Sequence, residues 1–207
     1  ALLADRGVDY LFGNAGTDFA SVIEALSKAQ LGESKAPTPV TVPHENVAVA
    51  MAHGYYLATG RPQAVMLHVS VGTANGVCGI VNAARERIPM LFSAGRTPIN
   101  EDGLPGSRSI YIHWAQEMFD QAGMVRELVK WDYELRNLEQ LETVVDRALT
   151  ISMSEPRGPV YLTLPREVLA QKPGAFTYDS PTRRHPAKAG APNANVVDEA
   201  ADLLAKA

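Results

Sequence analysis

Residues 40–52 carry the sequence VTVPHENVAVAMA. The β-branched run at 40–42 is typical of a strand, and Pro43 ends it. A single acid, Glu45, comes next, followed by small apolar residues without a charge, which is typical of a buried helix. This order places Glu45 at the carboxyl end of a strand, where open α/β sheets bind their ligands. Glu45 is therefore the first candidate for an acid that takes part in chemistry.

Strand-like and helix-like segments alternate along the chain. The predicted strands are residues 10–13, 40–42, 64–69, 90–94, 128–131 and 160–164, and the predicted helices are 19–28, 46–58, 74–84, 114–122 and 138–154. Short connections between alternating strands and helices predict an α/β fold. We expect a three-layer sandwich, in which helices cover both faces of a mostly parallel central sheet.

The composition narrows the class of protein. The chain has 207 residues, a net charge of −4 and scattered Lys and Arg, which argues against nucleic acid or an anionic membrane as a partner. Cys78 is the only cysteine, so a disulfide framework or a thiolate metal cluster is excluded. No apolar run is long enough to cross a membrane and no signal peptide is visible, so we expect a cytoplasmic protein.

The chain is predicted to divide into three parts. Residues 1–170 form the α/β domain, and the proline-, glycine- and charge-bearing stretch 171–194 is predicted to be a linker. Asn195 is the expected cap of an amphipathic helix that continues to the end of the chain. This helix has no evident packing partner, so residues 195–207 are expected to begin a further domain that is truncated here.

Three turns follow the first three predicted strands. They are FGNAGT at residues 12–17, His44-Glu45, and HVSVGTAN at residues 68–75. Glycine in such turns lets a ligand approach the backbone and the amides at the start of a helix. Neither the phosphate-binding G-x-x-x-x-G-K-[ST] pattern nor the dinucleotide pattern G-x-G-x-x-G is present. The turns therefore indicate a bound cofactor, but not a nucleotide held by either of these two motifs.

These turns resemble those of a known family. Together with AARERIP (83–89), SAGRTP (93–98) and EPRGPVYLTLP (155–165), they resemble the N-terminal pyrimidine-binding (PYR) domain of thiamine-diphosphate-dependent 2-keto acid enzymes. That group includes acetolactate synthase, benzoylformate decarboxylase and pyruvate decarboxylase. The resemblance runs in order through residues 1–170, and it implies that residues 195–207 begin the central domain of such an enzyme.

The resemblance implies a catalytic and cofactor-binding role for Glu45. In this family a glutamate hydrogen-bonds N1′ of the aminopyrimidine and favours the imino tautomer, whose 4′ nitrogen takes the C2 proton of the cofactor. The activated cofactor then acts as the electron sink when a 2-keto acid loses CO2. The alternative is that Glu45 is a helix N-cap acid that interacts with the helix dipole.

His68 and Thr17 fall where benzoylformate decarboxylase has its active-site histidine and a substrate-binding serine. The resemblance implies that His68 is catalytic and that both residues bind the substrate, with His68 moving protons or orienting the carboxylate of the 2-keto acid. The alternative is a strand-end histidine that satisfies a backbone carbonyl. Gly72 and Asn75 match turn residues near the cofactor, and a plain helix start is the alternative for them.

The remaining expectations concern assembly and cofactors. Helices 46–58 and 74–84 are apolar or small on nearly every side, so a second subunit is expected to cover them in a dimer or tetramer. In the family, the cofactor lies between the PYR domain of one subunit and the diphosphate domain of its partner. The motif that holds Mg²⁺ and the diphosphate, Gly-Asp-Gly…Asn, is absent here, so the fragment is expected to hold no metal and to be inactive alone. Binding of FAD by the central domain is left open.

The favoured function is a thiamine-diphosphate-dependent 2-keto acid decarboxylase or carboligase similar to benzoylformate decarboxylase, because of His68 and Thr17. An acetolactate synthase-type enzyme is one alternative. A non-catalytic PYR-domain subunit or interaction module is another, although such a module would not need a carboxylate at Glu45. Ala15, Ser70 and Val71 depart from one or another member's pattern, so the residues do not assign a particular 2-keto acid.

Overall fold

The fold is built on one six-stranded sheet. The computed structural model describes residues 1–172, 174 and 176–207. The strand order is β2-β1-β3-β4-β6-β5, and every neighbouring pair is parallel. The strands are β1 (Tyr10–Asn14), β2 (Thr38–Thr41), β3 (Gln63–Leu67), β4 (Met90–Arg96), β5 (Asp132–Glu134) and β6 (Val160–Pro165).

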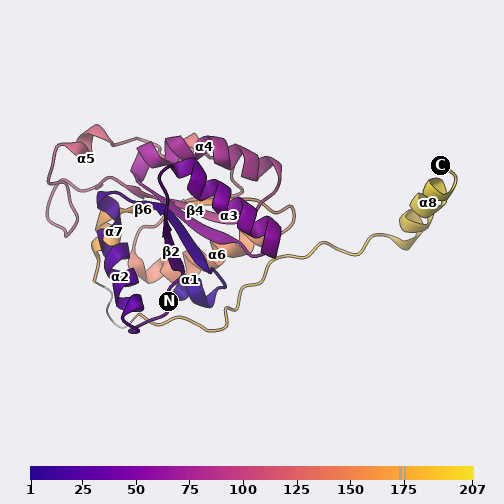
Figure 1. Ribbon diagram of the computed structural model, residues 1–207, viewed down its shortest axis with the longest axis horizontal. Coiled ribbons are helices and arrows are strands. Elements are labelled where there is room, and N and C mark those ends of the chain that lie inside the picture. Colours follow the sequence, from indigo (N-terminus) through magenta and orange to yellow (C-terminus); the bar gives the residue numbers. More distant parts are fainter. Residues whose placement is uncertain (173, 175) are drawn as a thin grey trace.

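Helices cover both faces of this sheet (Figure 1). One face carries α3 (Glu45–Thr59) and α4 (Val69–Arg85), and the opposite face carries α1 (Leu2–Asp5), α6 (Leu141–Met153) and α7 (Arg166–Ala170). The other helices are α2 (Ala20–Gln30), α5 (Ile112–Ala115) and α8 (Ala194–Ala205), with 3₁₀ turns at Thr17–Phe19, Ala122–Met124 and Leu138–Gln140. The predicted three-layer α/β sandwich is confirmed.

The buried central strands explain why this sheet needs two helical layers. All five residues of β3 are buried, and β4 is buried except at its last residue. Phe92 belongs to the core on the α3–α4 side, whereas its neighbour Leu91 belongs to the core on the α6 side. Alternate side chains of one strand thus enter opposite cores, as expected for a parallel sheet covered on both faces.

Sheet order places the carboxyl ends of β2, β1 and β3 side by side. The chain leaves β1 for β2 on one side and later returns to β3 on the other, so the order reverses between β1 and β3. A reversal of this kind opens a crevice at the carboxyl edge, where ligands bind in open α/β sheets. The turn that follows β1 lies against His68, the residue that follows β3.

Two predicted elements are wrong. Residues 114–122 do not form a helix, because only Ile112–Ala115 is helical and the buried amide of Gln121 binds Gly95 O (2.8 Å) and the Tyr161 hydroxyl (2.9 Å) instead. The fifth strand is Asp132–Glu134 rather than 128–131, because its pairing with β6 begins at Asp132. Helix α7 was not predicted.

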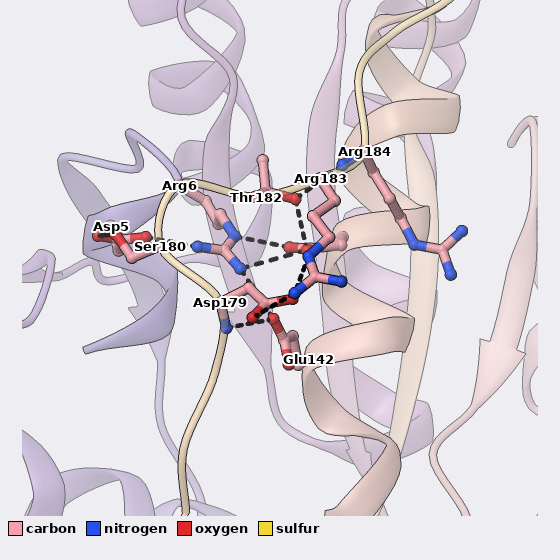
Figure 2. Close-up of polar contacts among 9 residues, drawn as sticks. Asp5, Arg6, Glu142, Asp179, Ser180, Thr182, Arg183 and Arg184 are labelled. Carbon is pink, nitrogen blue, oxygen red and sulfur yellow. Dashed lines mark hydrogen bonds and ion pairs between the residues drawn. The ribbon is translucent and has the colours of Figure 1, made fainter.

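Residues 176–193, called here the connecting segment, contain no helix or strand. Figure 2 shows how part of it lies against α1 and α6. Thr182 Oγ1 donates to Asp146 Oδ2 (2.6 Å), and the same carboxylate accepts from Arg6 Nε (2.7 Å). Asp179 N donates to Glu142 Oε1 (2.8 Å). These contacts fix residues 179–182 to the domain before the segment runs on to α8.

Helix α8 stands away from the sheet, with its apolar residues exposed (Figure 1). Its cap is Asn193 rather than the predicted Asn195, since the Asn193 side chain accepts from Asn195 N (3.0 Å). Across the described residues, none of the helices combines the length and apolar character needed to cross a membrane. The cytoplasmic location stays a prediction.

Candidate functional site

Glu45 is the first residue of α3, directly after the turn that leaves β2. Its side chain is 12% exposed, and His44 Nδ1 lies 3.9 Å from Oε2, beyond hydrogen-bond distance. None of the described residues donates a hydrogen bond to this carboxylate. Neither oxygen is among the fully buried atoms that lack a partner, so both can accept a hydrogen bond from water or from a bound group.

The cap of α3 is His44, not Glu45. His44 has an extended backbone, and its Nδ1 accepts from Asn46 N at 3.1 Å. The interpretation of Glu45 as the N-cap residue is therefore wrong, but its carboxylate does lie in the first turn of α3, where an acid interacts favourably with the helix dipole. Asn46 in turn accepts from Gly79 N (2.9 Å), which ties the start of α3 to the middle of α4. These contacts fix the backbone that carries Glu45.

The turn after β1 lies next to both neighbouring strands. Asn14 Nδ2 donates to the Val42 carbonyl at 3.0 Å and so joins this turn to the chain that leads to Glu45. Gly16 lies against the ring of His68 so closely that a side-chain carbon at Gly16 would overlap it. Thr17 is exposed and opens the 3₁₀ turn. The turn that carries Thr17 therefore lies against His68, at the carboxyl ends of β1 and β3.

His68 follows β3 and is paired with Asp18, an acid that the sequence pattern does not predict as part of the site. Its Nδ1 lies 2.6 Å from Asp18 Oδ1, and the side chains of His68 and Asp18 are 19% and 2% exposed. The alternative in which His68 binds a backbone carbonyl through Nδ1 is therefore wrong. The sequence places Asp18 just after the glycine turn that ends β1, but it does not show that this turn lies beside His68.

The backbone beside His68 is strained. Val69 has a φ of +37°, a region that β-branched residues rarely adopt. Two contacts hold it there: Val69 N donates to Asp18 Oδ2 (3.4 Å), and Thr73 Oγ1 donates to Val69 O (2.9 Å). Strain of this kind persists where surrounding contacts fix the conformation, often at functional sites.

A buried polar network supports this strained turn. The Tyr161 hydroxyl lies 2.8 Å from Thr73 Oγ1 and accepts from Gln121 Nε2, which also donates to Gly95 O. Burial raises the pKa of Tyr161, so the phenol keeps its proton near neutral pH. Because the Thr73 proton goes to Val69 O, the Tyr161 proton is directed to Thr73 Oγ1. Each hydroxyl in the network then has one acceptor.

Gly72 and Asn75 do not lie in a turn. Helix α4 begins at Val69, five residues earlier than the predicted 74, so both residues are helical. Gly72 is buried, and a side-chain carbon there would lie 3.0 Å from Leu67 Cβ. Gly72 therefore allows close packing of α4 on the end of β3. Asn75 is exposed on α4, one turn beyond Val71.

Two surface hollows lie elsewhere. One of about 730 Å³ is lined by residues that include Leu104, Glu167 and Phe176. The other, of about 310 Å³, is lined mainly by charged residues that include Arg96 and Asp120. Neither is lined by Thr17, Glu45 or His68. In the residues described, no group of three or more His, Cys, Asp or Glu is arranged to hold a metal ion.

The fold is a parallel α/β sheet with Glu45 and His68 after the carboxyl ends of its strands, which is the edge at which open α/β sheets bind ligands. The chain belongs to the family described as "Thiamine pyrophosphate enzyme, N-terminal TPP binding domain", whose family model matches residues 1–124. The family and the thiamine diphosphate cofactor predicted from the sequence are thus confirmed.

Proteins of similar sequence belong to the same family of enzymes. The chain is 27% identical to the acetolactate synthase large subunit of Buchnera aphidicola (subsp. Acyrthosiphon pisum) over 86% of its own length and 29% of that protein. It is 31% identical to benzoylformate decarboxylase of Pseudomonas aeruginosa over 62% of its own length and 23% of that protein. The chain therefore spans less than a third of either relative.

A solved structure shares the fold. The crystal structure of benzoylformate decarboxylase from Polynucleobacter necessarius matches 98% of the chain with a TM-score of 0.78 and 22% identity, and the match spans 35% of that protein. At this identity the likeness establishes the architecture. It agrees with the three-layer arrangement described above.

Proposed function

We propose that this chain is the pyrimidine-binding part of a thiamine-diphosphate-dependent 2-keto acid decarboxylase or carboligase similar to benzoylformate decarboxylase. The observation that carries the proposal is the Glu45 carboxylate. It is 12% exposed, stands at the carboxyl edge of the sheet, and accepts no hydrogen bond from the described residues. These features fit a group that accepts a hydrogen bond from a cofactor ring nitrogen.

When bound, thiamine diphosphate supplies a carbon nucleophile and an electron sink for the carboxylate-bearing carbon of a 2-keto acid. Glu45 holds the pyrimidine end of the cofactor and keeps its ring in the tautomer that can accept a proton. Gly72 and Asn75 contribute to cofactor binding at the start of α4. Thr17 and His68 bind the substrate, and His68 also transfers protons.

The site is incomplete in this chain. Mg²⁺ and the diphosphate are held by a further domain, so the 207-residue fragment alone is inactive. The proposed parts are the PYR domain at 1–170, a linker at 171–194, and the first helix of a central domain at 195–207. The exposed apolar residues of α8 support the last assignment, because such residues normally pack against a neighbouring element.

A second subunit covers α3 and α4 in the proposed enzyme, which is a homodimer or homotetramer. Val47 and Met51 on α3 and Val71 on α4 are 41%, 39% and 46% exposed. They lie on the same helices as Glu45 and Gly72, so an interface there would close the cofactor site between subunits. These exposed apolar side chains, on the helix that carries Glu45 and on its neighbour, support this interface.

An acetolactate synthase-type enzyme is the second candidate. The named relative of this kind matches a larger share of the chain than the benzoylformate decarboxylase does. His68 and Thr17 favour the decarboxylase. A non-catalytic module is the third candidate, and the free carboxylate of Glu45 argues against it.

The test uses the full-length protein with Mg²⁺ and thiamine diphosphate. Calorimetry measures cofactor binding, and CO₂ release is followed with benzoylformate and with pyruvate. Release from benzoylformate supports the decarboxylase, and acetolactate formed from pyruvate supports the second candidate. Failure to bind the cofactor would refute both and leave the module.

A further inference from the structure

Asp18 is a buried carboxylate whose two oxygens both face the start of α4. Oδ1 lies 2.6 Å from His68 Nδ1, and Oδ2 accepts from Val69 N at 3.4 Å. The carboxylate also lies against the backbone of β4, since a side-chain carbon at Gly95 would overlap it. Asp18 therefore bridges the ends of β1, β3 and β4 and has little freedom to rotate.

The ring of His68 is held in one orientation. Its Nδ1 faces Asp18, and its flank rests on Gly16. Within the described part of the chain, no hydrogen bond to Nε2 is formed. The side chain keeps 19% of its surface exposed. Nε2 is thus the nitrogen that is left for a ligand.

We propose that Asp18 is a positioning residue that fixes the proton of His68 on Nδ1, so that Nε2 is the nitrogen presented to the 2-keto acid. Neutral His68 then accepts a proton at Nε2, and protonated His68 donates its Nε2–H to the substrate carboxylate. This inference rests on the proposed function for its substrate. It assigns Asp18 a role through His68 and no contact with the substrate.

The donors and acceptors of this pair fix the position of the proton on His68. A neutral imidazole carries one N–H, and an ionised carboxylate only accepts, so the nitrogen facing Asp18 must be the protonated one. The second oxygen, Oδ2, must also be an acceptor. Val69 N–H is one of the donors at the start of α4 that have no partner within the helix, and it needs an acceptor there. Both oxygens of Asp18 must therefore be acceptors.

Asp18→Asn tests this requirement with little change in shape. The introduced amide has one acceptor and one donor end, and Val69 N–H attracts the acceptor. Its NH₂ group then faces His68 Nδ1, which must accept, and the proton moves to Nε2. An Asp→Asn change beside a catalytic histidine in serine proteases has this effect on the tautomer and lowers kcat by about 10⁴.

The first readout is the tautomer itself. Full-length holoenzyme labelled with ¹⁵N-histidine gives the nitrogen shifts of His68 by NMR, assigned from the signal lost in His68→Gln. We expect the Nδ1–H form in the wild type and the Nε2–H form in Asp18→Asn. An Nε2–H form in the wild type, or the same tautomer in both proteins, would overturn the proposal. This readout does not depend on any activity.

The second readout is CO₂ release. We expect Asp18→Asn to lower kcat by about 10²-fold or more with a smaller change in KM, and Asp18→Asn combined with His68→Ala to fall no further than His68→Ala alone. Additive losses would show that Asp18 acts independently of His68. Asp146→Asn is the control. It alters another buried acid, on α6 at the sheet face opposite α3 and α4, and should leave kcat unchanged. Absence of CO₂ from the wild type would refute the proposed function, and NMR would still decide the role of Asp18.

Discussion

At the residue scale, Gly95 leaves the space that the carboxylate of Asp18 occupies. A side-chain carbon at this position would overlap the carboxylate of Asp18. We expect Gly95→Ala to lower the free energy of unfolding by about 1–3 kcal/mol, because the buried carboxylate must leave its two partners or the strand must shift. Urea denaturation measures this. Unchanged stability would show that the crevice can relax around the added carbon.

The sequence pattern correctly placed Glu45 and His68 just after the ends of strands. It did not predict a role for Asp18. The two correct residues follow directly from the local pattern of strand, turn and helix. The contact of Asp18 with His68 depends on which strands are neighbours in the sheet. The local pattern does not contain this order, so the pair could not be inferred.

At the element scale, Gly79 and Gly54 form a matched pair. A side-chain carbon at Gly79 in α4 would lie 2.8 Å from Val49 Cγ1 on α3, whereas one at Gly54 in α3 would have no atom within 4 Å. We expect Gly79→Ala to destabilise the protein by about 1–3 kcal/mol through overpacking. Gly54→Ala should stabilise it by up to about 1 kcal/mol, as expected for a helix interior.

Thermal or urea unfolding of the two variants checks this pair. Equal effects of Gly79→Ala and Gly54→Ala would contradict the close contact between α3 and α4. A loss of stability in Gly54→Ala that disappears when the protein is diluted to monomers would place Gly54 in a subunit contact.

The boundaries of elements were predicted less well than their order. Helix α4 begins before the predicted residue because Asp18 and Thr73 hold Val69 in place, and both contacts depend on tertiary structure or on a strained backbone. Residues 116–121 do not form a helix, because the Gln121 amide has buried partners in β4 and β6 instead. Periodicity alone does not report such contacts.

At the scale of the whole molecule, the exposed apolar face of α3 predicts the assembly. Val47→Glu should shift the full-length protein towards the monomer, because a charge would be buried in the proposed interface. Ile23→Glu is the matched control, since Ile23 is exposed on α2. Analytical ultracentrifugation separates the states. Dissociation by both variants, or by neither, would contradict the interface on α3.

Because Asp146 holds the connecting segment through its ionised carboxylate, the stability of the fold is expected to depend on pH in the acid range. Burial works to raise the pKa of Asp146, but hydrogen bonds from Arg6 and Thr182 outweigh it and hold the pKa below its usual value. A carboxyl whose pKa is lowered by folding stabilises the protein above its unfolded-state pKa of about 3.9, and this contribution is lost as the pH falls through the lower folded-state value.

We therefore expect Asp146→Asn to cost about 2 kcal/mol of unfolding free energy at pH 7, and progressively less as the pH falls below about 3.9 and through the lower pKa of the folded protein. Denaturation of the wild type and of Asp146→Asn across this pH range measures the difference between their unfolding free energies. The other carboxyl groups are present in both proteins, so their contributions cancel in this difference. A difference that stays constant with pH would show that the charge of Asp146 does not stabilise the fold. Asp9→Asn, at a partly exposed pair with Arg61, should change stability less.

The most direct test of the central claim replaces the carboxylate of Glu45. Full-length wild type, Glu45→Gln and the exposed control Glu24→Gln are compared for CO₂ release with saturating Mg²⁺ and thiamine diphosphate. We predict a loss of roughly tenfold or more in kcat for Glu45→Gln, because an amide is a poorer acceptor for the cofactor ring than a carboxylate, and no loss for Glu24→Gln. Wild-type turnover by Glu45→Gln would contradict the claim that Glu45 activates the cofactor.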